Sequence, residues 1–189
     1  LHDTLFNGSG LGVGLYGTPL QGVLIIPQPG ANNIYYIFTV DGWEHFFLNG
    51  LRYSIVDMNL DSGKGSVTQK NILLCAPTCE ALGSVSDATG CGYWLVTHER
   101  YTDIFRAYHI TYAGIDTSAV ISAIGPNCGF MANMNQYCGI YGINFSSNGN
   151  LFASIDFWGW LNGTGIPDTL SIYQFNKNIV SLNQNNNLV

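Results

Sequence analysis

The sequence predicts an all-β fold made of repeated four-stranded antiparallel sheets. Three observations predict it: apolar segments of strand length recur along the chain, turn residues separate them, and helical periodicity is nearly absent. Charged residues make up 10% of the 189 residues, against roughly 25% in ordinary soluble domains. Asn, Ser, Thr, Gln and Gly supply the polarity instead, and they suit turns and outward strand positions.

An internal repeat is the strongest pattern. Residues 34–41 (IYYIFTVD) recur as residues 92–99 (GYWLVTHE) and, more loosely, as residues 150–156, at a period of about 58 residues. Each segment is an aromatic-rich strand that ends near an acid. Each is followed by a second strand with alternating apolar and polar residues, at 51–57, 105–111 and 170–176.

One strand before and one after complete each repeat. The preceding strands are expected at 22–27, 81–86 and 139–145, and the following strands at 67–74, 119–125 and 180–189. Four short strands per repeat of roughly 45 to 60 residues are typical of a β-propeller blade. A β-sandwich is the alternative, although its strands would follow one another every 8 to 12 residues or so without a recurring four-strand unit.

Turn residues mark the strand boundaries. Asn148-Gly149 predicts a tight hairpin in which both residues take positive φ angles. Glycine-containing connectors at 61–65 and 112–116 separate third and fourth strands, and Pro27 ends a first strand because proline cannot donate a ladder hydrogen bond.

The expected organisation is one partial propeller. Residues 1–20 would end a preceding blade, and residues 21–75, 76–126 and 127–189 would each form one blade. The opening residues resemble mid-domain sequence, so we expect a fragment or a processed piece. Three blades leave two open edges, which attract other strands. The expected partners are therefore the remaining blades and domains of the same protein or, less simply, a second chain.

Charge and hydropathy exclude two classes of partner. The formal net charge is −6 with six Lys and Arg, so no basic stripe is available for a nucleic-acid backbone. No segment approaches the ~20 uninterrupted apolar residues of a membrane helix, and we expect no membrane insertion.

The five cysteines favour short-range disulfides over a metal site. Their spacing fits neither a zinc finger nor a CxxC motif. Cys75 with Cys79, and Cys128 with Cys138, could each close a small loop in an oxidising compartment, which leaves Cys91. The alternative is that several are buried thiols.

A family resemblance adds a location. Residues 7–11, 23–30, 33–41, 50–60 and 93–99 together resemble the N-terminal propeller of large Bacteroidetes surface proteins that the type IX secretion system exports, often labelled gliding-motility-associated. The resemblance covers about residues 7–125, and the cysteine-rich stretches and residues 158–167 depart from it. It implies an extracellular, cell-surface location and brings no catalytic residues with it.

Two groups of residues are candidates for binding. Asp41, Glu99 and Asp156 stand at related repeat positions and could gather around the propeller channel to hold Ca²⁺, unless each acid only caps a turn. Aromatic residues in the connections between second and third strands could stack on sugars or anchor proteins, unless they pack between blades. These aromatic residues are Trp43, Phe46, Phe47, Tyr101, Trp158 and Trp160.

We therefore expect an exported structural or interaction module for scaffolding, adhesion or binding of glycans or surface proteins. No Ser or Cys stands in a nucleophile-elbow context such as GxSxG, and the expected module is not an enzyme. The alternative is a propeller hydrolase or lactonase-like enzyme with a metal in its channel.

Overall fold

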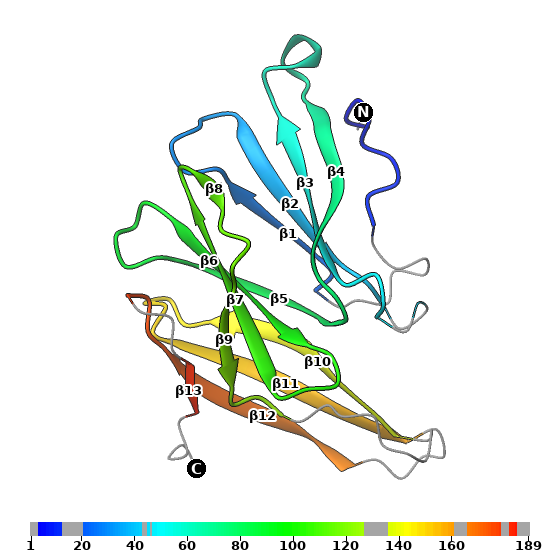
Figure 1. The fold of residues 1–189 in the computed structure, drawn as a ribbon, viewed down its shortest axis with the longest axis vertical. Coiled ribbons are helices and arrows are strands. Elements are labelled where there is room, and N and C mark those ends of the chain that lie inside the picture. The colour runs from blue at the N-terminus through cyan, green and yellow to red at the C-terminus, as the bar shows by residue number, and fades with distance from the viewer. Residues whose placement is uncertain are drawn as a thin grey trace.

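The chain folds into three antiparallel β-sheets (Figure 1). A computed structural model describes residues 4–12, 21–42, 45, 47–126, 136–160, 166–178 and 182–184, without the side chains of 136–138, 157–160, 166–168 and 182–184. Each sheet lies within one of the ranges 21–75, 76–126 and 127–189. In the described part of the chain, no helix is long and apolar enough to cross a membrane.

Sheets A and C are antiparallel meanders that follow the chain order, and in sheet B both β8 and β9 pair with β7. Sheet A contains β1 (Val23–Pro27), β2 (Ile34–Val40), β3 (Leu51–Asp57) and β4 (Ser66–Cys75), with a short 3₁₀ helix at Asp61–Gly63 before β4. Sheet B contains β5 (Thr78–Ser86), β6 (Tyr93–Glu99), β7 (Ile104–Thr111), the two-residue β8 (Gly114–Ile115) and β9 (Val120–Ala123). Sheet C contains β10 (Gln136–Phe145), β11 (Leu151–Trp160), β12 (Ile166–Phe175) and β13 (Leu182–Gln184). The all-β prediction is confirmed, with three antiparallel sheets. Sheets A and C have the expected four strands, whereas sheet B has five, because β8 forms within the expected connector 112–116.

The hairpin between β10 and β11 corrects the expected turn geometry. Gly149 has a φ of 70°, whereas Asn148 keeps an ordinary negative φ. The Ser146 amide donates to the Leu151 carbonyl at 2.9 Å, and the Ser146 hydroxyl accepts from the Leu151 amide at 3.1 Å. Because a side chain completes the turn, only the glycine needs the left-handed conformation.

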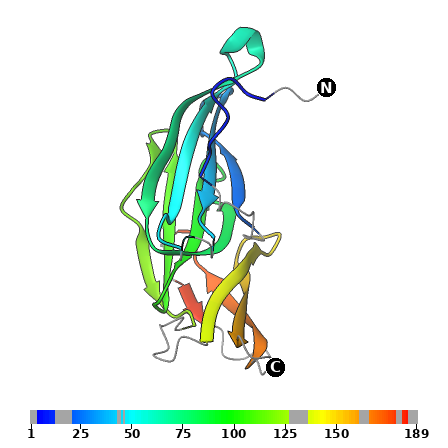
Figure 2. The same ribbon diagram turned by 90° about the vertical axis from the view of Figure 1, so that its right-hand side faces the viewer.

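Sheet B lies between the other two sheets and buries both of its faces (Figures 1 and 2). One face contacts sheet A through Leu82, Leu95, Tyr108 and Ile110. The opposite face contacts sheet C through alternate residues of the same strands: Cys79, Ala81, Trp94, Val96, Phe105 and Ala107. Alternate residues of each strand therefore pack into different cores, which explains why these strands are apolar almost throughout.

The first strands of the three sheets approach one another. A Cβ atom built on Gly83 of β5 would lie 2.5 Å from Ile143 Cγ2 and 3.0 Å from the Ile143 carbonyl oxygen in β10. The Ile143 amide donates to the side-chain oxygen of Gln21, just before β1, at 3.1 Å. β5 also contacts β1. Glycine at position 83 thus permits a backbone approach that any side chain would obstruct.

Each outer face of the stack combines covered and exposed apolar residues, and sheet A exposes 51% of Val23 and 60% of Ile25. On sheet A, the segment 4–12 packs its Leu5 and Leu11 against Ile37, Val56 and Val67. Phe6 of this segment forms a parallel bridge with Ser66 of β4. On sheet C, the face directed away from sheet B exposes 48% of Ile155 and 63% of Leu170, two residues that pair across β11 and β12. Exposed apolar side chains that adjoin one another on a surface can mark a contact site.

Replacement of Leu95 by alanine tests the core between sheets A and B. Leu95 is fully buried, so Leu95→Ala should lower the free energy of unfolding by about 2 to 5 kcal/mol. Leu73→Ala is the matched control, because Leu73 is half exposed. This replacement should lower the free energy of unfolding by less than about 1 kcal/mol. Urea denaturation followed by tryptophan fluorescence measures both. Equal losses for the two variants would contradict the assigned core.

Candidate functional site

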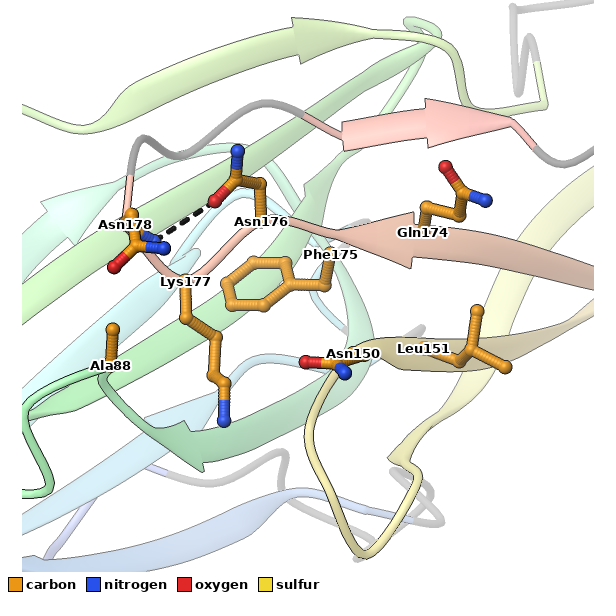
Figure 3. A pocket seen from close by; sticks show the side chains of 8 residues that line it. All are labelled: Ala88, Asn150, Leu151, Gln174, Phe175, Asn176, Lys177 and Asn178. Carbon is orange, nitrogen blue, oxygen red and sulfur yellow. Dashed lines mark hydrogen bonds between the residues drawn. The ribbon is translucent and has the colours of Figure 1, made fainter.

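A polar pocket opens where the turns of sheets B and C meet (Figure 3). Its volume is about 410 Å³. One wall comes from the turn after β5, a second from the turn before β11, and the third from the end of β12 and the residues after it. The lining residues are Ala88, Asn150, Leu151, Gln174, Phe175, Asn176, Lys177 and Asn178.

Hydrogen bonds fix the pocket's backbone. The Phe175 amide donates to the Asn150 carbonyl at 2.8 Å, which joins two of the walls. The Asn178 amide donates to Asn176 Oδ1 at 3.0 Å, an Asx turn that ends the β12 segment (Figure 3). The Phe175 ring belongs to the core between sheets B and C. The pocket therefore rests on a fixed apolar floor.

Lys177 connects the pocket to both sheets. Its Nζ donates to the Asn148 carbonyl at 2.8 Å, and its own carbonyl accepts from Trp94 Nε1 of β6 at 3.2 Å. The Trp94 ring stacks on His109 with a centroid distance of 4.1 Å, and His109 Nε2 lies 3.1 Å from Asp87 Oδ2. Burial alone would raise the Asp87 pKa, but hydrogen bonds from Thr89, His109 and Gly92 lower it to about 2. Asp87 is thus ionised at neutral pH and orients His109 beneath Trp94.

Hydrogen-bonding amides dominate the lining of the pocket. Its four side-chain amides, from Asn150, Gln174, Asn176 and Asn178, offer both donors and acceptors. Its described lining holds no carboxylate, imidazole, thiol or hydroxyl side chain. Glycoside hydrolysis ordinarily uses a pair of carboxylates, and acyl transfer uses a nucleophile with a base. Sequence patterns did not predict this pocket, whose only local signal is the pair of runs NGN at 148–150 and NKN at 176–178.

Two of the predicted aromatic residues, Phe47 and Tyr101, lie together against one arginine. Phe47 is buried, and its ring lies 4.3 Å from the guanidinium carbon of Arg100, while the Tyr101 ring lies 5.2 Å from the same atom. These two rings thus pack around a buried arginine where sheets A and B meet, the arrangement that the sequence left open as the alternative. Trp43 and Phe46 lie outside the described residues.

The positions of Trp158 and Trp160 correct the sequence interpretation. Both belong to β11, where Trp160 pairs with Gln136 and Trp158 with Cys138 and Ile166, rather than to a connection between strands. The antiparallel pairing of β11 with β10 and β12 continues through Trp158. Their side chains are not among those described.

The three acids expected around a channel have separate partners. Asp41 follows β2, and its Oδ2 accepts a hydrogen bond from the Asn49 amide at 2.9 Å. Its Oδ1 lies 2.8 Å from His45 Nδ1. Glu99 ends β6 and forms an ion pair with Arg106 of β7. Asp156 lies inside β11 and accepts from the Ser154 hydroxyl at 3.2 Å. Within the described ranges, no three His, Cys, Asp or Glu side chains gather as a metal ion would need. Asp41 thus caps a loop, as the alternative reading of the acids anticipated.

The expected disulfide between Cys75 and Cys79 is not formed, and both residues are free thiols. Cys75 ends β4 and packs between sheets A and B, whereas Cys79 lies in β5 and packs between sheets B and C. The chain crosses from one sheet to the next between them, which directs the two side chains into different cores. Cys91 is also a free thiol. Cys128 and the Cys138 side chain lie outside the described part.

Cys79 and His98 form a buried pair without the properties of a catalytic dyad. Cys79 Sγ lies 3.6 Å from His98 Nδ1, and both residues are completely buried. Burial, followed by the charge of Arg100, lowers the His98 pKa to about 3, and burial raises the pKa of Cys79. A neutral imidazole and a neutral thiol without access to solvent offer no activated nucleophile.

Comparison of the chain with protein-family models, with curated proteins and with solved structures gave no match.

Replacement of Asp156 by asparagine tests the buried carboxyl. Burial raises the Asp156 pKa to about 6, against the lowering effect of its bond from Ser154. The folded state thus holds a proton that the unfolded state releases near pH 4, so stability should decline as pH rises from about 4 to 6.

Asp156→Asn should remove this decline and raise stability above pH 6 by at most about 3 kcal/mol. Urea denaturation at a series of pH values measures it. Parallel pH profiles for Asp156→Asn and the wild type would contradict the buried, protonated carboxyl.

Proposed function

We propose that this chain is a segment of a β-propeller that serves as a non-catalytic structural and glycan-binding module on the cell exterior. The observation that carries the function is the 410 Å³ pocket at the boundary of sheets B and C, with its amide-rich lining. Four amides and a lysine that surround an apolar floor can exchange hydrogen bonds with sugar hydroxyls in both directions.

The arrangement of the sheets supports the propeller. Three antiparallel sheets of four or five strands follow one another along the chain, adjacent sheets pack face to face, and the first strands approach one another through Gly83, Ile143 and Gln21. In a propeller, the blades surround a central channel in this manner. The exposed apolar side chains of Ile155 and Leu170 on sheet C then mark where another blade would pack, from the same polypeptide or from a second chain.

The external location rests on composition and resemblance. Low charge, small polar residues in the turns and the likeness of residues 7–125 to type IX-exported propellers favour it. The free thiols Cys75 and Cys79 remove one of its earlier supports, because they no longer indicate an oxidising compartment.

The alternative of a metal-dependent propeller hydrolase predicts a bound ion. Metal analysis of the purified protein by plasma mass spectrometry distinguishes the two functions. The scaffold predicts no stoichiometric metal, whereas one retained equivalent that Asp156→Asn abolishes would favour the enzyme.

Calorimetric titration with cellotetraose, maltotetraose and mannotetraose tests the pocket. We expect at least one of these neutral oligosaccharides to bind. Gln174→Ala together with Asn176→Ala should weaken that binding at least tenfold, because each variant removes hydrogen bonds worth about 1 kcal/mol.

Gln69→Ala is the matched control. Gln69 is an exposed amide on β4 of sheet A, far from the pocket, and its loss should leave affinity unchanged. Failure of all three oligosaccharides to bind would overturn the glycan assignment, as would undiminished affinity in the double variant.

A further inference from the structure

A second polar cavity, of about 240 Å³, lies over sheet A and is unrelated to the pocket between sheets B and C. It occupies the end of the sheet where β2 leads into β3, beside the N-terminal segment. Its described lining consists of Gly12, Asp41, His45, Asn49, Arg52 and Asn71. We propose that this cavity binds the carboxylate and adjacent hydroxyls of an acidic sugar unit of the uronic acid class.

The Arg52 guanidinium is held in place before any ligand arrives. Its Nε donates to the Asn49 carbonyl at 2.9 Å, and its Nη1 donates to the Asn71 carbonyl at 3.0 Å. Both acceptors are uncharged, and no carboxylate of the described residues pairs with Arg52. A fixed guanidinium with further N–H donors recognises a carboxylate through two parallel hydrogen bonds.

Asn71 makes the cavity wall rigid. Its backbone takes a φ of 54°, and its amide donates to Ser54 Oγ at 3.0 Å. Its side chain accepts from the Gly12 amide and donates to the Gly10 carbonyl, each at 2.9 Å. The N-terminal segment is thereby attached to sheet A beside the Arg52 side chain. Because this wall is ordered in the folded protein, a ligand that binds there loses little affinity to the entropy of ordering it.

His45 supplies a second polar group. Its Nδ1 lies 2.8 Å from the buried carboxylate of Asp41, which fixes the ring orientation and leaves Nε2 for another partner. The side chain is 33% exposed, so solvent and ligands reach it. The other Asp41 oxygen accepts from the Asn49 amide at 2.9 Å. The imidazole is thus positioned for a hydroxyl of the ligand.

The charge balance selects the ligand class. The single guanidinium of Arg52 suits a singly charged group, and the Asp41 carboxylate, which contacts His45 and the Asn49 amide, would repel the second charge of a dianionic phosphate. The cavity volume exceeds that of a carboxylate alone and leaves room for a sugar ring. Hydroxyls on that ring would contact His45 rather than an apolar wall.

Calorimetric titration of the full chain with galacturonate, galactose, acetate and inorganic phosphate tests the proposal. We expect galacturonate to bind at least tenfold more tightly than the other three compounds. Arg52→Gln should weaken galacturonate binding at least tenfold, because it removes the charged partner. Lys64→Gln is the matched control, since it removes one positive charge at the opposite end of β3 and should change nothing.

A thermal melt of each variant checks the fold. If Arg52→Gln loses its cooperative transition, His45→Gln carries the test, because His45 is partly exposed and should weaken galacturonate binding at least threefold. Absence of galacturonate binding, equal affinity for galactose, acetate or phosphate, or unchanged affinity in the folded variants would each overturn the assignment. Loss of the neutral oligosaccharide site would leave this result unaffected.

Discussion

The structure depends on the burial of both faces of sheet B. Each face of this sheet carries large apolar side chains: Leu95 and Tyr108 on one, Phe105 and Val96 on the other. At roughly 25 cal/mol per Å² of apolar surface, exposure of either face would cost more than a small sheet can offset. Sheet B is therefore stable only between two neighbours, and sheets A and C acquire their positions from it.

The same constraint explains where binding sites arise. The sheet faces that lie between adjacent sheets are buried by packing. Open polar surface therefore remains at the sheet ends, where turns from different repeats meet. The pocket at Asn176 uses turns from sheets B and C, and the cavity at Arg52 uses one loop of sheet A together with the N-terminal segment. Some polar groups in the interior make no hydrogen bond. His98 Nε2 and two nitrogens of Arg100 are buried without hydrogen-bond partners among the described residues. A buried polar group without a partner costs free energy in the folded state.

Strands were predictable from sequence because period-two alternation and turn residues are local signals. The expected segments 34–41, 51–57 and 105–111 match β2, β3 and β7 to within a residue. Side-chain partners were not predictable, because they depend on which sheet a face meets. Cys75 and Cys79 are close in sequence and lie in different cores. Trp158 was predicted to lie in a connection between strands, but it belongs to β11 and pairs with β12. Both polar cavities combine residues from separate segments, as Gly12 with Arg52 illustrates, and no spacing in the chain reveals such a combination.

The stacking of sheet B on sheet C is tested most directly by nuclear Overhauser contacts between aromatic rings. The Phe105 ring of β7 lies 5.2 Å from that of Phe152 in β11 and 5.1 Å from that of Tyr173 in β12, centroid to centroid. Cross-peaks between the Phe105 ring protons and those of both partners are expected in the folded protein. Their absence, with Phe105 contacting only residues of its own sheet, would contradict face-to-face packing.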